Sequence, residues 1–308
     1  MSEFSHLEKL LTAGHFVATA ELGPPKGTDL RVIERKAGFL RGYVDAVNVT
    51  DNQTAVVRMS SIGVAAILVR MGLEPIIQMT CRDRNRLAIQ ADLLGAWALG
   101  IRSVLCLSGD HQVFGNHPQA KNVFDLDSTQ LIQMVRRMGE TGQFQCGDPI
   151  DGPAPRFYVG GAANPFADPF DFRPLRLMKK AKAGAQFCQT QMIFNVPKFA
   201  EFMKRTVDLG LDKEVKLLAG VGPIKSLGAA KYMASKVPGM DVPDEIVNRM
   251  QAAPKDKRQE EGIKICAEII QQCRELPGVA GVHIMAIEWE EVVPQLMEMS
   301  GLLPRPIA

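Results

Sequence analysis

Eight short apolar runs recur along this 308-residue chain, and the segments between them have helical patterning. The runs cover residues 16–21, 43–50, 74–80, 102–108, 156–162, 185–194, 215–221 and 279–287. They are continuously apolar rather than alternating, which is typical of strands that are covered on both faces. Alternating strands and helices predict a parallel sheet, and eight such units predict an α/β fold closed into a single (β/α)8 barrel, the TIM-barrel architecture.

The segments between the runs have the periodicity of amphipathic helices. Apolar side chains fall mostly on one side of residues 84–99, and residues 257–273 show the same pattern. Gly100, Gly184 and Gly210 stand where such helices should end. A doubly wound open sheet is the alternative fold. It needs a G-x-G-x-x-G turn after the first strand, and the sequence there reads LGPPKG.

Two connections are longer than the others. Residues 111–155 are rich in Gly, Pro, Asn and Asp around one helix-like stretch near 128–138, and loops of this length often carry function. Residues 226–276 predict a helical excursion of two helices. No shift in composition marks a domain boundary, so we expect residues 1–308 to form a single barrel domain.

Composition argues against several classes of function. The chain has 36 Lys and Arg against 34 Asp and Glu, without the basic excess that drives nucleic-acid binding. Its apolar runs are too short to cross a bilayer, and no signal-type apolar stretch begins it. The six cysteines form no C-x-x-C pair, and the five histidines lack ligand-like spacing. We therefore expect a cytoplasmic protein with no metal site, no nucleic-acid partner and no membrane partner.

Polar residues stand at the ends of most of the predicted strands. In chain order they are Glu21, Thr50, Asp51, Asn52, Thr80, Asp110, Asn164, Gln189, Gln191 and Glu288. A single carboxylate after a strand is usually a helix cap or a solvated turn. In a closed barrel, however, all strand ends lead to one mouth, so the set predicts an active site there. Carboxylates and amides suit hydrogen bonding and proton transfer to a polar heterocycle or carbonyl compound. No P-loop and no G-x-S-x-G elbow occurs, which argues against phosphoryl transfer and hydrolysis.

Six segments carry motifs that recur together. They read ATAELGPPKG, NVTDN, IIQMTCRDRNR, GIRSVLCLSGDH, YVGGAANPFADP and KAKAGAQFCQTQMIFN. In this order they resemble the methylenetetrahydrofolate reductase family, and the resemblance runs over residues 16–283. It implies a βα barrel that holds a flavin, FAD or FMN, at its strand ends. The implied reaction reduces 5,10-methylenetetrahydrofolate to 5-methyltetrahydrofolate by hydride transfer from the reduced flavin.

The resemblance also assigns roles to particular residues. Glu21 would be the general acid that assists opening of the folate imidazolidine ring. A carboxyl group donates a proton near neutral pH only where its surroundings favour the neutral form, and the apolar sequence neighbours of Glu21 fit that requirement. Asp110 would bind the pterin beside the flavin pyrimidine and tune the flavin potential. Gln191 would bind the folate, and Glu288 completes the predicted substrate contacts. The flavin contacts would be Thr50, Asn52, Thr80, Gly109, Asp110, Asp127, Ser128, Ala162, Asn164 and Lys180.

Two positions depart from the family pattern. The best-known bacterial members carry a Phe in the helix after strand seven, where this chain has Met233 beside Tyr232. They carry an Arg after strand eight, where this chain has Trp289. Both positions belong to the side that handles nicotinamide or the folate tail. NAD(P)H is therefore one expected electron donor. An iron–sulfur partner subunit, as in the partner-dependent members, is the other. We expect such a partner to dock at an exposed Trp289 and at the 110–155 loop, and we expect an oligomer.

Two functions of other classes remain open. A non-redox βα-barrel methyltransferase that binds a pterin would use similar polar residues without flavin. A non-catalytic barrel subunit of a larger complex would need none of them, so the presence of Glu21, Asp110 and Gln191 argues against it.

Overall fold

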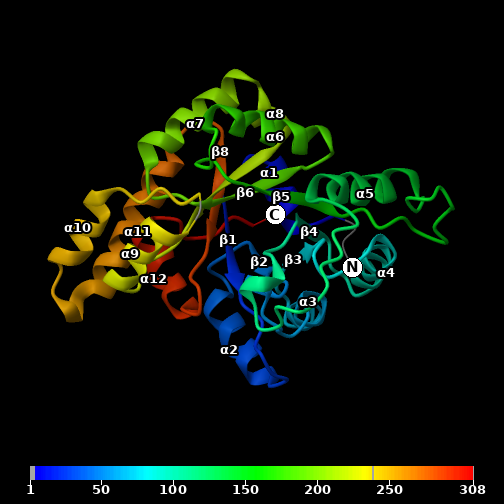
Figure 1. Cartoon of the computed structure of the whole chain (residues 1–308), viewed down its shortest axis with the longest axis horizontal. Coiled ribbons are helices and arrows are strands. Elements are labelled where there is room, and N and C mark those ends of the chain that lie inside the picture. The colour runs from blue at the N-terminus through cyan, green and yellow to red at the C-terminus, as the bar shows by residue number, and fades with distance from the viewer. Residues whose placement is uncertain (1–3, 238, 308) are drawn as a thin grey trace.

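Each strand of the barrel pairs in parallel with the next strand in sequence, and β8 pairs with β1 to close the ring (Figure 1). The computed structural model describes residues 4–237 and 239–307. The strands are β1 (Val17–Leu22), β2 (Ala46–Val49), β3 (Pro75–Thr80), β4 (Ser103–Leu107), β5 (Tyr158–Ala163), β6 (Phe187–Met192), β7 (Lys216–Val221) and β8 (Val279–Ile284). Each falls within or overlaps one apolar run of the sequence. The predicted (β/α)8 barrel is thus confirmed, and the open-sheet alternative is wrong.

Helices surround the strands, and one of them, α1, lies across the amino-terminal end of the barrel (Figure 1). They are α1 (His6–Thr12), α2 (Leu30–Leu40), α3 (Ser61–Arg70), α4 (Arg86–Ala98), α5 (Ser128–Thr141), α6 (Arg173–Lys182), α7 (Val196–Asp208), α8 (Leu211–Glu214), α9 (Leu227–Lys236), α10 (Asp244–Ala252), α11 (Arg258–Arg274) and α12 (Val293–Met299). Polar side chains fix where several of them begin. The Asn85 side chain, for example, accepts a hydrogen bond from Ala88 N, which starts α4 at Arg86.

The amino-terminal end of the barrel is filled by apolar side chains. Leu7, Leu10 and Leu11 of α1 pack there in one buried cluster with the first inward-facing residues of the strands. Those strand residues include Val17, Ala46, Ile76, Tyr158 and Phe187. Helix α1 therefore closes this end, and an open cavity can form only at the carboxyl ends of the strands.

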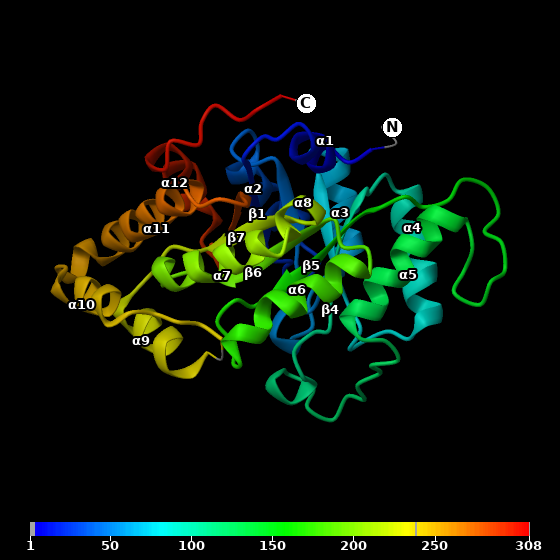
Figure 2. The ribbon, with the colours of Figure 1, turned by 90° about the horizontal axis from the view of Figure 1, so that it is seen from above.

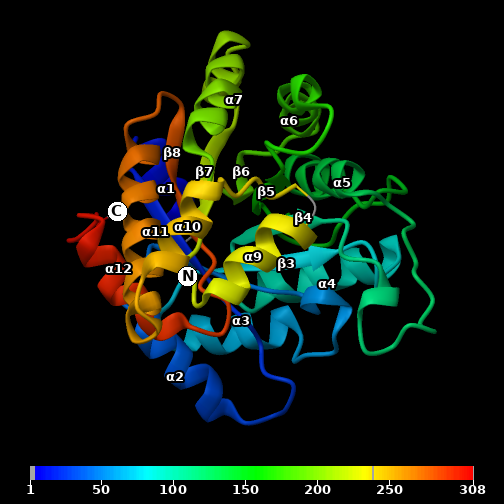
Figure 3. The ribbon, with the colours of Figure 1, turned by 60° about the vertical axis from the view of Figure 1, so that its left-hand side comes forward.

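The two long connections lie at opposite ends of the molecule (Figure 2). The first contains a short 3-10 turn (Gln112–Phe114), the helix α5 and the projecting segment 142–155. The second contains three helices, α9, α10 and α11, so the prediction of two helices is wrong. Helices α9 and α10 come forward in Figure 3. Within residues 4–237 and 239–307, no helix has both the length and the apolar character that a membrane span requires.

Candidate active site

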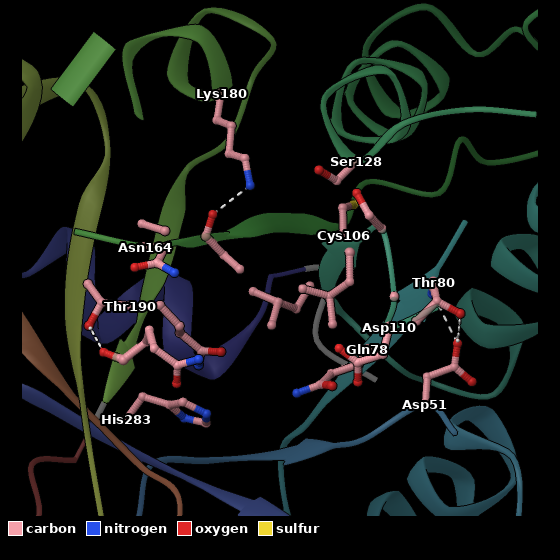
Figure 4. A pocket seen from close by; sticks show the side chains of 18 of the residues that line it. Asp51, Gln78, Thr80, Cys106, Asp110, Ser128, Asn164, Lys180, Thr190 and His283 are labelled. Carbon is pink, nitrogen blue, oxygen red and sulfur yellow. Dashed lines mark hydrogen bonds between the residues drawn. The ribbon is translucent and has the colours of Figure 1, made fainter. Parts of the chain in front are cut away.

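A cavity of about 530 Å³ opens where the strands end, a volume in the usual range for substrate and cofactor sites (Figure 4). Most residues predicted for the site contribute to its wall. They are Glu21, Asn52, Thr80, Gly109, Asp110, Ser128, Ala162, Asn164, Lys180 and Gln191. The barrel thus brings together residues that lie up to 170 positions apart in the sequence, as the convergence of strand ends in this fold requires.

Three predicted residues lie outside the cavity wall. Asp127 accepts hydrogen bonds from Thr129 N and Gln130 N, so its side chain caps α5. Glu288 is 67% exposed and accepts a long hydrogen bond of 3.4 Å from Arg58. Thr50 is buried, and its hydroxyl group has no hydrogen-bond partner in the described part of the chain. Their roles as ligand contacts stay predictions.

The two positions that depart from the family pattern lie in different surroundings. Trp289 is only 7% exposed, so the expectation of an exposed tryptophan is wrong. Its ring packs in the core, and Lys225 Nζ lies 5.5 Å from the ring centroid. Met233 packs partly buried against the core, whereas Tyr232 beside it is exposed. Of these two neighbouring residues of α9, Tyr232 is therefore the one that is accessible to solvent.

Glu21 lies at the floor of the cavity, with 14% of its side chain exposed. Gln78 Nε2 donates to Glu21 Oε1 across 3.3 Å. The imidazole Nε2 of His283 lies 3.7 Å from the same oxygen. Sequence reasoning missed both neighbours. Alternation of side chains along a strand could have identified Gln78. It precedes the cavity residue Thr80 by two positions and therefore faces the same interior.

Beneath Glu21 the barrel interior is polar rather than apolar. Asn48 Nδ2 donates to Gln189 Oε1 across 2.7 Å, and Gln189 Nε2 donates to Asn48 Oδ1 across 3.0 Å. Gln189 Nε2 also donates to Thr19 Oγ1 across 3.2 Å, and that oxygen lies 2.9 Å from His283 Nδ1. These buried groups satisfy one another's hydrogen bonds, as buried polar side chains must.

A buried carboxylate positions Thr80 in the wall. Asp51 Oδ2 accepts hydrogen bonds from both the backbone nitrogen and the hydroxyl group of Thr80, each across 3.0 Å. Arg84 pairs with the same carboxylate across 2.7 Å and also with Asp92 across 2.8 Å. Asp51 thus lines the cavity itself, positions Thr80 beside it and receives its counter-charge from Arg84.

Arg82 joins the loops that follow β2, β3 and β4. Its guanidinium donates to the main-chain oxygens of Asp110 (3.0 Å) and Asn52 (3.2 Å), and it pairs with Asp83 across 2.6 Å. The hydrogen bond to Asp83 raises the pKa of Arg82, so the guanidinium stays charged. Asp110 Oδ2 in turn accepts a hydrogen bond from Thr54 N across 3.1 Å.

The backbone around Asp110 adopts uncommon conformations. Asn52, Thr54 and Ala55 have positive φ angles of 46°, 55° and 57°. Non-glycine residues in this region cost conformational energy and cluster at functional sites. Gly109 has φ 89°, and a Cβ there would lie 3.1 Å from side-chain carbons of Thr80 and Arg82. The absence of a Cβ at Gly109 thus lets the backbone after β4 pass close to Thr80 and Arg82.

Positive side chains line the cavity from α6. Lys180 reaches in from the side away from His283 and donates to Ala162 O across 2.5 Å (Figure 4). Arg173 and Arg176 of the same helix complete this part of the wall. Burial lowers the pKa of Lys180, because desolvation disfavours its charged form. A bound anion near Lys180 would favour the charged form of its ammonium group, so this side of the cavity suits a phosphate-bearing ligand.

The thiols near the cavity are expected to be unreactive. Burial raises the pKa of Cys81 to about 12, and it also raises the pKa of Cys106, whose side chain lines the wall. Neutral, buried thiols are poor nucleophiles and poor metal ligands. In residues 4–237 and 239–307, no three His, Cys, Asp or Glu side chains group closely enough to hold a metal ion.

Comparison with known proteins places the chain in a family. The family model described as methylenetetrahydrofolate reductase matches residues 6–301. This chain belongs to the methylenetetrahydrofolate reductase family. A probable methylenetetrahydrofolate reductase (NADPH) of Caenorhabditis elegans is 24% identical over 258 residues, which are 82% of this chain and 36% of that protein. The 5,10-methylenetetrahydrofolate reductase of Pectobacterium carotovorum is 23% identical, over 94% of this chain and 92% of the relative.

Length separates these relatives into two groups. The chain spans 36% of the Caenorhabditis elegans protein and 36% of methylenetetrahydrofolate reductase 2 of Schizosaccharomyces pombe, to which it is 26% identical. Among solved structures, a Clostridium thermocellum protein described as binding two copies of 5-methyl-5,6,7,8-tetrahydrofolic acid has a TM-score of 0.63 at 14% identity. The comparison covers 97% of this chain and 99% of that one. This likeness shows that the two proteins share the barrel fold.

Proposed function

We propose that the chain is a flavin-dependent reductase that converts 5,10-methylenetetrahydrofolate to 5-methyltetrahydrofolate, with Glu21 as the general acid. One observation carries the proposal: Glu21, Asp110 and Gln191 line a single cavity whose opposite wall is positively charged. The names of the family and of its bacterial relatives support this substrate and its reduction. The Clostridium thermocellum protein of the same fold, described as binding 5-methyl-5,6,7,8-tetrahydrofolic acid, supports a folate ligand.

The polar groups of the cavity fit a flavin nucleotide. Lys180, Arg173 and Arg176 supply positive donors suited to the phosphate groups of FAD or FMN. Outside the cavity wall, the buried Thr50 hydroxyl at the end of β2 has no partner among the described residues and is a further proposed contact. Asn164 and Ser128 add neutral polar groups. When bound, the flavin would supply the hydride that the methylene carbon receives.

The protein's own side chains would manage binding and proton transfer. Glu21 would donate a proton to the ring nitrogen that leaves the methylene carbon, so that one hydride and one proton are added in total. Asp110 would accept hydrogen bonds from pterin N–H groups. The Oε1 atom of Gln191 accepts from Met192 N across 2.9 Å, which leaves the amide N–H groups of Gln191 to donate to the folate.

The replacement Glu21→Gln tests the proposal. The purified protein should be yellow, and the variant should keep its fold and its flavin. Its rate of methylenetetrahydrofolate reduction should fall by about 10²–10⁴-fold, the usual contribution of a general acid. Glu291→Gln, at an exposed glutamate, is the control and should leave the rate unchanged. A colourless protein would contradict the reductase and favour the methyltransferase or the non-catalytic subunit, and an unimpaired Glu21→Gln variant would remove the acid role.

The electron donor is a separate part of the proposal. We propose that electrons come either from NAD(P)H or from an iron–sulfur partner subunit, because Met233 and the buried Trp289 replace family residues on the nicotinamide side. Anaerobic assays with NADH, NADPH and a reduced viologen, each added alone, separate the two. Turnover with NADH or NADPH would exclude the need for a partner. Turnover with the viologen alone would indicate a missing electron-delivery subunit.

A further inference from the structure

A chain of four buried polar side chains ends at Glu21. Thr19, Asn48, Gln189 and His283 are each at most 3% exposed. Barrel interiors are usually filled at this depth by branched apolar residues, and burying polar groups costs free energy. The amides, the hydroxyl and the imidazole instead form a connected series of hydrogen bonds. The direction of these bonds therefore decides which protons face Glu21.

The direction can be followed from the amide pair. Gln189 uses Oε1 as acceptor from Asn48, so its Nε2 donates to Thr19 Oγ1 across 3.2 Å. The Thr19 oxygen thus already accepts a hydrogen bond, and its own proton is free to be donated. His283 Nδ1 lies 2.9 Å away, closer than the alternative acceptor Val282 O at 3.5 Å. The hydroxyl group therefore donates to Nδ1, which must be the unprotonated ring nitrogen of a neutral imidazole.

The other end of the series agrees with this direction. With Nδ1 as acceptor, His283 carries its proton on Nε2, and Nε2 is the atom 3.7 Å from Glu21 Oε1. Gln78 Nε2 also donates to Oε1, across 3.3 Å. Two N–H groups therefore converge on one carboxyl oxygen, whereas no described residue donates to Oε2. The distance from His283 exceeds that of a formed hydrogen bond, and such contacts at active sites commonly tighten when substrate binds.

We propose that His283 is a positioning residue, held as its Nε2–H tautomer by Thr19, Gln189 and Asn48, and that it fixes the transferable proton of Glu21 on Oε2. This inference rests on the proposed role of Glu21 as the acid. When Glu21 is neutral, an Oε1 that accepts from His283 and Gln78 cannot also carry the proton. The O–H bond that breaks during transfer is then the one at Oε2, and the carboxylate that remains is stabilised by the same two N–H groups.

The tautomer can be measured directly, without any assay of activity. In protein labelled with 15N-histidine, the two ring nitrogens of His283 should give one protonated and one unprotonated chemical shift, with the proton on Nε2. The signals of His283 among the five histidines are identified by their loss in His283→Gln. In Thr19→Val, which removes the hydroxyl donor at similar side-chain volume, the preference for Nε2–H should weaken. A proton on Nδ1 would overturn the proposal, because Nδ1 would then donate to Thr19 and the unprotonated Nε2 could not donate to Glu21.

Two matched substitutions test the consequence for Glu21. Glutamine at position 283 can place an amide N–H near the position of Nε2, whereas asparagine can mimic only the contact at Nδ1. The measured quantity is the rate at which methylenetetrahydrofolate reoxidises the dithionite-reduced flavin under anaerobic conditions. His283→Asn should slow this step by about 10- to 100-fold, the usual effect of losing a hydrogen bond to a charged group. His283→Gln should recover most of the rate, and the flavin content and folate dissociation constant should change little in either variant.

The outcomes separate this proposal from the reductase proposal. If the wild-type chain binds no flavin or does not reduce the folate, the reductase proposal fails, and with it the proton-positioning role, although the tautomer measurement still decides the direction of the hydrogen bonds. If the wild type is active and His283→Asn is as fast as His283→Gln, only the role of His283 fails. If folding of the asparagine variant is impaired, Thr19→Val provides the comparison, because it keeps the imidazole and should slow the same step by a smaller factor.

Discussion

Arg82 and Asp110 lie 28 positions apart, and the guanidinium of Arg82 donates to the main-chain oxygen of Asp110 across 3.0 Å. The same guanidinium holds the main-chain oxygen of Asn52. Asp110 and Asn52 both line the cavity, and the loop that begins at Asn52 has left-handed backbone at non-glycine positions. One arginine side chain thus holds two wall-forming loops at the separation that the cavity requires.

Arg82→Met should weaken both the fold and flavin binding. Removing the guanidinium leaves the main-chain oxygens of Asp110 and Asn52 without this donor, which costs about 1.5–3 kcal/mol where a charged donor is lost. Urea unfolding measures the loss of stability, and flavin fluorescence measures the rise in dissociation constant. Arg86→Met is the control, because Arg86 pairs with Asp125 at the exposed surface, where solvent screens the ion pair and its loss should change stability little. Equal effects of the two substitutions would contradict the role of Arg82.

Asp51→Asn should destabilise the protein more than Asp92→Asn, although both aspartates pair with Arg84. Asp51 is buried and also accepts two hydrogen bonds from Thr80, whereas the Asp92 side chain is 39% exposed. We expect a cost of about 1.5–3 kcal/mol for Asp51→Asn, and about 0–1 kcal/mol for Asp92→Asn. Urea denaturation of the two variants provides the comparison. A larger loss in Asp92→Asn would show that solvent screens the pair with Asp51.

The barrel and much of its site could be predicted from the sequence because both follow from periodic patterns. Continuous apolar runs mark strands that are covered on both faces. Once eight strands are present, closure brings residues such as Glu21, Thr80 and Gln191 to one cavity, whatever their separation in sequence. The inward-facing His283 could have been found by the same reasoning, because it lies two positions before Met285, another cavity residue.

Features that depend on loop conformation could not be predicted in this way. Trp289 follows Glu288, whose φ of 49° turns the chain, and this turn directs the indole ring into the core. A sequence pattern carries no signal for such a turn at a non-glycine residue. The second connection holds one helix more than the two predicted, whereas the helix expected after strand seven, with Met233, is present as α9. Arg82 was missed because its partners are main-chain oxygens, which leave no mark in the sequence.

Gly160→Ala should destabilise the barrel, and Gly95→Ala should stabilise it. A Cβ at Gly160 of β5 would lie 2.3–2.5 Å from ring atoms of Phe187, which fills the interior beside it. Overpacking of this kind costs about 1–3 kcal/mol. At Gly95, within α4, a Cβ would meet nothing within 4 Å, so alanine should contribute about 0.5–1 kcal/mol through helix propensity. Thermal or urea unfolding measures both effects. Stabilisation by Gly160→Ala would show that Phe187 can move aside at no cost.

Glu74→Gln should stabilise the protein at neutral pH and have a smaller effect in acid. Burial raises the pKa of Glu74, because desolvation outweighs the hydrogen bonds from Ser5, His6 and Ser103 and the charge of Arg102. The folded state therefore binds this proton more tightly than the unfolded state does. The contribution of Glu74 to stability is accordingly most favourable below its unfolded pKa, and it is lost as the pH rises through the folded value. In the present structure His6 N donates to Glu74 Oε1 across 3.2 Å. A glutamine at position 74 keeps an oxygen acceptor for this hydrogen bond and carries no charge at any pH. The difference in unfolding free energy between variant and wild type, measured in urea across a pH series, should therefore grow from acid towards neutral pH. A difference that stays constant with pH would show that Glu74 titrates alike in both states.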